Sequence, residues 1–197
     1  MTKSIKILSH DILSRGYGIL QKVTLRRRRF DGDEQEITRE IYDTGDGAAI
    51  LLYDPDRGCV LLVRQFRLAA YLSGGRETLV EVCAGKLEGL DAAARIVMEV
   101  AEETGFDIKN PRYLFDAYMS PGVFCEKLSF FVARYAAKDR NGTGGGLANS
   151  GEDIEILEPT LEEALQMVAR GEIVDAKTIL LLTYAKLTGL LEKPSEK

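Results

Sequence analysis

The sequence is poor in the side chains from which many enzyme sites are built. It has one histidine, His10, among 197 residues. A zinc site made of several imidazoles is therefore excluded, and a nucleophile–histidine dyad would need His10 itself. Because imidazole and thiolate ligands are scarce, a catalytic metal would be bound by carboxylate oxygen atoms, which suit Mg²⁺ or Mn²⁺.

Cysteine and long apolar runs are scarce as well. The three cysteines, Cys59, Cys83 and Cys125, form no CxxC pair, so we expect thiols in a reducing compartment, with Cys59 and Cys83 in the core. No stretch approaches the roughly 18 consecutive apolar residues of a membrane span. Residues 1–14 lack the apolar centre and cleavage site of a signal peptide. The sequence therefore predicts a cytoplasmic protein with no membrane partner.

Positive charge is also in short supply. There are 26 Lys and Arg against 31 Asp and Glu, a net charge of −5, which argues against nucleic acid as a partner. Residues 81–107 alone carry seven acidic and two basic side chains. This local surplus is typical of a place that binds divalent cations, through which an acidic protein can bind an anion.

Turn signals and apolar runs predict an α+β fold with helices packed on a mixed sheet. We expect strands over 17–25, 35–42, 48–53, 59–66, 78–84, 113–119, 128–135 and 154–157. We expect helices over 91–104, 161–170 and 176–187. Residues 1–44 have few large apolar side chains and predict a small β element, while 45–197 predict the main domain. The glycine-rich stretch 138–152 predicts a mobile loop.

The helix over 91–104 is the best defined of these elements. Asp91 suits its N-cap and Gly105 the position after its last turn. At 100° per residue, one face gathers the apolar side chains and predicts a core contact. Glu99 and Glu103 would lie on the opposite face, with Glu102 on their side.

Three carboxylates within one turn repel one another and oppose the helix dipole. They form either a solvated acidic face or a divalent-cation site, where the metal offsets their repulsion. The strand and loop that precede the helix favour the second interpretation. Gly85 allows close approach of a ligand, and the carbonyl of Ala84 would add an oxygen donor.

These residues match a known pattern. Gly85, Asp91 and the run 99–106 (EVAEETGF) resemble the signature of the Nudix hydrolase superfamily. Two departures stand out: Met98 replaces the usual basic residue before Glu99, and the spacing is one residue short. Arg95, one helical turn earlier, would substitute for the missing base.

The resemblance covers nearly the whole chain. Residues 61–67, 81–88 and 120–122 are similar to the Nudix group that cleaves ADP-ribose and nucleotide sugars. Residues 39–53, 83–85, 144–146, 152–155 and 171–178 are similar to its GDP-mannose pyrophosphatase branch, which also has the shorter spacing. The resemblance implies a Nudix α/β/α sandwich with a mixed sheet, plus an N-terminal antiparallel sheet used in dimerisation.

The resemblance also implies a metal and catalytic set. Glu99, Glu103, the Ala84 carbonyl and Glu152 would bind Mg²⁺, with Mn²⁺ as an alternative. Glu102 would bind the metal or position a water molecule. Glu152 would be the general base, with Asp153 and Glu155 as rivals; a solvated acidic loop is the plainer alternative.

Several residues would contact the substrate by the same resemblance. They are Arg67, Gly85, Lys86, Glu126 and Lys177 in the main domain, and Tyr17, Arg39 and Glu40 in an N-terminal sheet that crosses to a partner subunit. Arginine suits a diphosphate and tyrosine can stack on a base. Ordinary surface ion pairs are the alternative for the charged members.

Three functions follow. The first is a homodimeric, Mg²⁺-dependent pyrophosphatase that converts a nucleotide sugar, GDP-mannose, to GMP and mannose 1-phosphate. The second is hydrolysis of ADP-ribose to AMP and ribose 5-phosphate. The third is a nucleotide-sugar-binding module without turnover, which the departure at Met98 would fit.

Overall fold

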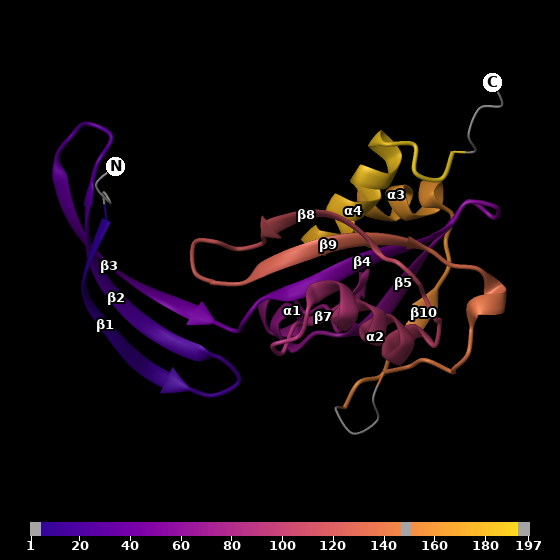
Figure 1. The fold of residues 1–197 in the computed structure, drawn as a ribbon, viewed down its shortest axis with the longest axis horizontal. Helices are drawn as coiled ribbons and strands as arrows, with labels where there is room; N and C mark the ends of the chain where they lie inside the picture. Colours follow the sequence, from indigo (N-terminus) through magenta and orange to yellow (C-terminus); the bar gives the residue numbers. More distant parts are fainter. Residues whose placement is uncertain (1–4, 147–150, 193–197) are drawn as a thin grey trace. The chain divides into compact units, whose positions relative to one another are not determined.

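The structure is a computed structural model of the chain, and it describes residues 5–146 and 151–192. Its contacts divide the chain into two units. The first unit comprises Met1–Asp46 and Tyr118–Lys127, and the second comprises Gly47–Ala117 and Leu128–Lys197. Figure 1 shows the helices and strands that build them.

The first unit is built on a three-stranded antiparallel sheet. Its strands are β1 (Ile5–Arg15), β2 (Ile19–Arg28) and β3 (Glu34–Asp43), in the order β1-β2-β3. The expected strands 17–25 and 35–42 are therefore confirmed, and β1 is an addition. Arginines 26–28 end β2, which is the central strand of this sheet. The Arg26 side chain of β2 forms ion pairs with acidic side chains of β3. For example, Arg26 Nη2 lies 3.3 Å from Glu36 Oε2.

The segment Tyr118–Lys127 also belongs to this first unit. The Tyr42 N–H donates to Val123 O at 2.8 Å, and the Cys125 N–H donates to Tyr42 O at 3.1 Å. The rings of Tyr42 and Phe124 meet edge to face with centroids 5.9 Å apart. Two stretches far apart in sequence thus form one unit.

The second unit is built on a seven-stranded mixed sheet in the order β10-β5-β4-β9-β8, with β6 paired to β5 and β7 to β4. Its strands are β4 (Gly47–Asp54), β5 (Cys59–Phe66), β6 (Thr78–Glu81), β7 (Cys83–Lys86), β8 (Arg112–Tyr118), β9 (Lys127–Arg134) and β10 (Glu155–Leu157). The β4–β9 pair is parallel, whereas β4–β5 is antiparallel. The central strand β4 is buried on both faces.

The expected hairpin at residues 48–66 is confirmed. Asp54 closes its turn by accepting the N–H groups of Asp56 and Arg57 at 3.0 and 3.2 Å. The single strand expected over 78–84 is wrong in one respect, because it breaks at Val82 into β6 and β7. At the break the Val82 N–H donates to the Thr178 hydroxyl at 2.8 Å, which satisfies a buried donor.

Helices cover both faces of this sheet (Figure 1). They are α1 (Leu68–Gly74), α2 (Ala92–Thr104), α3 (Leu161–Ala169) and α4 (Ala176–Leu187). The predicted helices correspond to α2, α3 and α4, and α1 was not expected. Ile96 and Val100 of α2 pack in one core cluster with Ile50 and Leu52 of β4. The observed arrangement is the expected α/β/α sandwich.

Cys83 lies in this core as expected, whereas Cys59 is only half-buried. Among the described residues, no helix is long and apolar enough to cross a membrane.

Candidate active site

The candidate site is built on α2 and on the strand β7 that precedes it. The helix has the ends predicted for it: Asp91 accepts the Ala93 N–H at 2.9 Å, and Gly105 is left-handed with φ of 72°. The Gly105 N–H donates to Ala101 O at 3.0 Å. These caps fix where the last turn of α2, with its carboxylates, begins and ends.

Glu99 and Glu103 are buried, with only 8% and 5% of their surface exposed. The expectation that they lie on the face opposite the core is therefore wrong. The helix packs against both β4 and β7. The buried face of α2 is therefore wider than the face formed by its apolar side chains alone. The carboxylate pair lies inside the protein, where an uncompensated charge is costly.

Gly85 of β7 is what lets this pair fit. A Cβ at position 85 would lie 1.7 Å from Oε1 of Glu99, a contact that no side chain can make. The Glu99 carboxylate therefore lies directly against the backbone of β7, beside Ala84. The close approach inferred from the sequence for Gly85 is a contact with Glu99.

Arg95 supports the glutamates from the preceding turn, as the sequence suggested. Its Nη2 lies 2.5 Å from Glu99 Oε1, and its Nη1 lies 3.6 Å from Glu102 Oε2. Its Nε donates to the carbonyl of Lys86 at 3.1 Å, which ties α2 to the end of β7. Met98, where the Nudix signature has its base, is 45% exposed.

The electrostatics of the pair indicate a need for positive charge. Burial, reinforced by the charge of Glu99, raises the pKa of Glu103 to about 8. Burial also raises the pKa of Glu99 to about 7, although Arg95 opposes the shift. Within the described residues, Glu103 Oε2 is a buried oxygen without a hydrogen-bond partner. Hard oxygen donors of this kind fit a divalent cation.

A complete cage of side chains is not preformed. In the ranges 5–146 and 151–192, no three His, Cys, Asp or Glu side chains are grouped so that they could hold a metal. Mg²⁺ commonly keeps several waters and takes substrate oxygens, so two carboxylates and a carbonyl are a sufficient start.

Glu152 lies near the pair, and its rivals do not share its position. Its charge contributes to the raised pKa of both Glu99 and Glu103. Glu155 lies in β10, where it forms an ion pair with Arg64 at 2.6 Å. Asp153 and Glu152 are both exposed, but only Glu152 is among the main influences on the pKa of the two buried carboxylates. Of the three rival acids, Glu152 is thus the one whose charge acts on both members of the buried pair.

Arg67 and Lys177 both bind the carboxylate of Glu81, a residue that was not predicted from the sequence. Glu81, 3% exposed, accepts Arg67 Nε and Lys177 Nζ, each at 2.8 Å. Lys177 also donates to Asp175 at 2.9 Å. The charge of Arg67 opposes the rise in the pKa of Glu103, so Arg67 lies close enough to influence this carboxylate. The available signal was an acidic residue in the apolar run 79–83.

Comparison with known proteins decides the family. Residues 43–182 match the family model of the NUDIX domain. The chain belongs to the Nudix family. In this Nudix protein, residues 4–42 also match a model described as the GDP-mannose pyrophosphatase NudK N-terminal domain. The resemblance drawn from the sequence is thereby confirmed.

Two similar relatives of this Nudix protein carry the same name. The GDP-mannose pyrophosphatase of Citrobacter koseri is 42% identical over 192 residues, covering 97% of this chain and 100% of the relative. The protein of the same name from Escherichia coli O157:H7 is 42% identical over 193 residues, covering 98% and 100%. A solved structure titled an ADP compounds hydrolase matches with a TM-score of 0.71 at 18% identity, over 95% and 96% of the two chains. It supports the fold alone.

Four predicted substrate contacts lie in the first unit of this Nudix protein. Tyr17 is in the turn between β1 and β2 with 81% of its surface exposed. Arg39 and Glu40 are adjacent in β3 and so point to opposite faces of the sheet. Glu126 is half-buried in the segment 118–127. Lys86, the remaining contact, is half-buried in β7.

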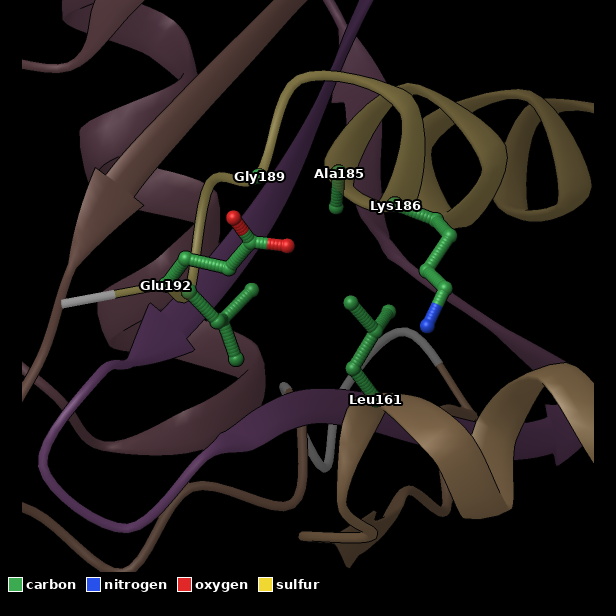
Figure 2. A pocket seen from close by; sticks show the side chains of 6 residues that line it. Leu161, Ala185, Lys186, Gly189 and Glu192 are labelled. Atoms are coloured by element: carbon green, nitrogen blue, oxygen red, sulfur yellow. The ribbon is translucent and has the colours of Figure 1, made fainter.

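A separate hollow lies between the start of α3 and the end of α4 (Figure 2). Its lining residues are Leu161, Ala185, Lys186, Gly189, Leu191 and Glu192. None of the predicted site residues is among them, so the hollow is not part of the candidate active site.

Proposed function

We propose that this Nudix protein hydrolyses the diphosphate of a nucleotide sugar, with GDP-mannose converted to GMP and mannose 1-phosphate. The observation that carries the proposal is the buried Glu99–Glu103 pair, in which Glu99 packs against Gly85 and Glu103 Oε2 has no hydrogen-bond partner among the described residues. It occurs in a chain 42% identical, over nearly its full length, to proteins named GDP-mannose pyrophosphatase.

Mg²⁺, or Mn²⁺ in its place, would be held by Glu99, Glu103, the Ala84 carbonyl and Glu152. When bound, such an ion neutralises phosphate charge and lowers the pKa of a coordinated water. The raised pKa values of Glu99 and Glu103 support this assignment, because a cation would replace the protons that burial favours.

The other site residues act on the attacking water and on the diphosphate. Glu152 accepts a proton from the attacking water, whose oxygen bonds to one phosphorus. The bond from that phosphorus to the bridging oxygen breaks, and the other phosphate leaves with the bridging oxygen. Glu102 positions that water or joins the metal shell. Arg67 and Lys177 bind the diphosphate, oriented by Glu81.

We also propose a homodimer in which the N-terminal sheet serves the partner's site through Tyr17, Arg39 and Glu40. Glu126 also contacts the substrate in this proposal. Strand β1 supports this, because its apolar side chains are exposed: Ile5, Ile7, Leu8, Ile12 and Leu13. Light scattering should give twice the mass of the chain. A monomer at micromolar concentration that retains full activity would contradict the exchange of N-terminal sheets.

The three unpaired cysteines fit a reducing compartment, and we assign the protein to the cytoplasm.

ADP-ribose is the second candidate substrate. It is favoured by the residues around Arg67, which are similar to the Nudix group that cleaves ADP-ribose and nucleotide sugars. We expect kcat/KM to be higher for GDP-mannose, since the N-terminal domain model that matches carries that name. A higher kcat/KM for ADP-ribose would transfer the proposal to the alternative.

The test is incubation with GDP-mannose and Mg²⁺, with the products separated by ion exchange. GMP and mannose 1-phosphate should appear in equal amounts. Tight binding without products, in folded protein assayed with both substrates, would instead identify a binding module without turnover.

A further inference from the structure

The last turn of α2 is held by a run of glycines. Residues 141–146, which we call the glycine clasp, lie along the C-terminal end of the helix. The Gly145 and Gly146 N–H groups donate to the carbonyls of Glu103 and Glu102 at 2.9 and 3.2 Å. The N–H groups of residues 141 and 142 donate to Gly105 O at 2.8 and 3.0 Å. The clasp is therefore docked on the end of α2. The sequence predicted a mobile loop over 138–152, of which residues 147–150 lie outside the described residues.

Docking this close depends on glycine. At Gly144, with φ of +66°, a Cβ would lie 2.5 Å from the carbonyl carbon of Thr104 and 2.8 Å from Glu103 O. At Gly105 a Cβ would lie 2.3 Å from Gly142 O. Backbone cannot move aside as a flexible side chain can, so the clasp and α2 fit only without these carbons.

The clasp also borders Glu152. A Cβ at Gly146 would lie 2.6 Å from the Cβ of Glu152 and 2.8 Å from its Oε2. The Ile154 N–H donates to Gly145 O at 3.3 Å, and Ile154 is buried in the core cluster. Glu152 is thus packed on one end of the clasp and lies two residues from a buried anchor.

We propose that the glycine clasp is a positioning device, which docks on the last turn of α2 and thereby sets Glu152 against Glu99 and Glu103. The clasp N–H groups also satisfy helix carbonyls that would otherwise add to the negative potential at this end of α2. The inference rests on the role given to Glu152 in the proposed function. Gly144 is its decisive residue because a Cβ there would collide with the backbone of Thr104 and Glu103.

The test compares Gly144→Ala with Gly58→Ala. Gly58 lies in the β4–β5 turn with φ of +67° and nothing within 4 Å of its added Cβ, so it controls for the cost of a left-handed alanine. We expect Gly144→Ala to lower kcat on GDP-mannose roughly 10- to 100-fold at unchanged KM, because displacements of about 1 Å at a reacting group have such effects. Gly58→Ala should keep the wild-type kcat. Equal losses in the two variants would overturn the proposal.

A double-mutant cycle shows whether the effect acts through Glu152. Added to Glu152→Gln, the Gly144→Ala change should lower kcat by less than twofold, because the displaced group is already disabled. The full loss in that background would contradict positioning of Glu152. A thermal melt of each variant restricts the comparison to folded protein.

Hydrogen exchange tests the clasp without turnover. The amides of residues 145 and 146 should be protected in the wild type and in Gly58→Ala, and should exchange faster in Gly144→Ala. Fast exchange in the wild type would overturn the clasp itself. If the clasp amides are protected but Glu152→Gln keeps the wild-type kcat, the role of Glu152 fails rather than the docking, and the positioning proposal falls with it.

Discussion

Arg95 shows how one residue can replace another from a different place on a helix. Its guanidinium contacts Glu99 and Glu102 and bonds the Lys86 carbonyl, so it orients two carboxylates and joins them to β7. The signature of the family expects this charge at position 98, which holds an exposed methionine. Spacing of one turn along α2 brings Arg95 to the same carboxylates.

Variants that transfer the arginine from position 95 to position 98 test whether Arg95 replaces the base of the signature. Arg95→Met should lower kcat about 10- to 100-fold and weaken Mg²⁺ binding, because a charge-assisted hydrogen bond contributes about 1.5–3 kcal/mol. Met98→Arg alone should be nearly neutral. The double variant should recover part of the lost Mg²⁺ affinity, measured by calorimetry. Recovery of neither affinity nor activity would mean that Arg95 acts only where it now lies.

Among the helices and strands, those whose ends and buried faces depend on neighbouring residues in the sequence were predicted. Helix α2 is amphipathic and capped at both ends, and it was predicted almost residue for residue. Helix α1 was missed because it is short, has no side-chain cap and buries none of its residues. The break at Val82 was missed because it depends on β6 and β7 pairing with different strands. The burial of Glu99 and Glu103 likewise depends on β7, which a helical projection ignores.

The caps of α2 make a prediction about stability. Asp91→Ala should lower the free energy of unfolding by about 1 kcal/mol, because the Ala93 N–H loses its acceptor. Asp91→Asn keeps an oxygen acceptor and should cost much less. Urea denaturation of both variants measures the difference. Equal stabilities for the alanine and asparagine variants would contradict the capping role.

At the scale of the whole molecule, the fold holds acidic groups in a place that disfavours their charge. The addition of residues 118–127 to the first unit was not anticipated, because that contact joins distant stretches of sequence. The net charge of −5 does not show where negative charge is disfavoured. That place is α2, where burial raises the pKa of Glu99 and Glu103.

This arrangement predicts how stability depends on pH. The pKa values of Glu99 and Glu103 rise from 4.5 to about 7 and about 8 on folding, so between these limits the native state binds more protons than the unfolded state. Stability is then greatest at low pH within this window and is lost as pH rises toward 8. In EDTA, the Tm should fall from pH 6 to pH 8.5.

Added Mg²⁺ should raise the Tm more at pH 8.5 than at pH 6, because fewer protons compete with the cation. The Glu103→Gln variant should show a flatter dependence in EDTA. A Tm that rises with pH in EDTA would contradict the account of the buried pair.

The central claim is that the buried carboxylates of α2 enable metal-dependent cleavage of GDP-mannose. Its most direct test measures GMP release by the wild type and by Glu103→Gln, each with Mg²⁺ and with EDTA. We predict rapid release only for the wild type with Mg²⁺, and a kcat lower by about 10³-fold or more for the variant, which loses a metal-binding oxygen. Release at the wild-type rate by Glu103→Gln, or by the wild type in EDTA, would contradict the account.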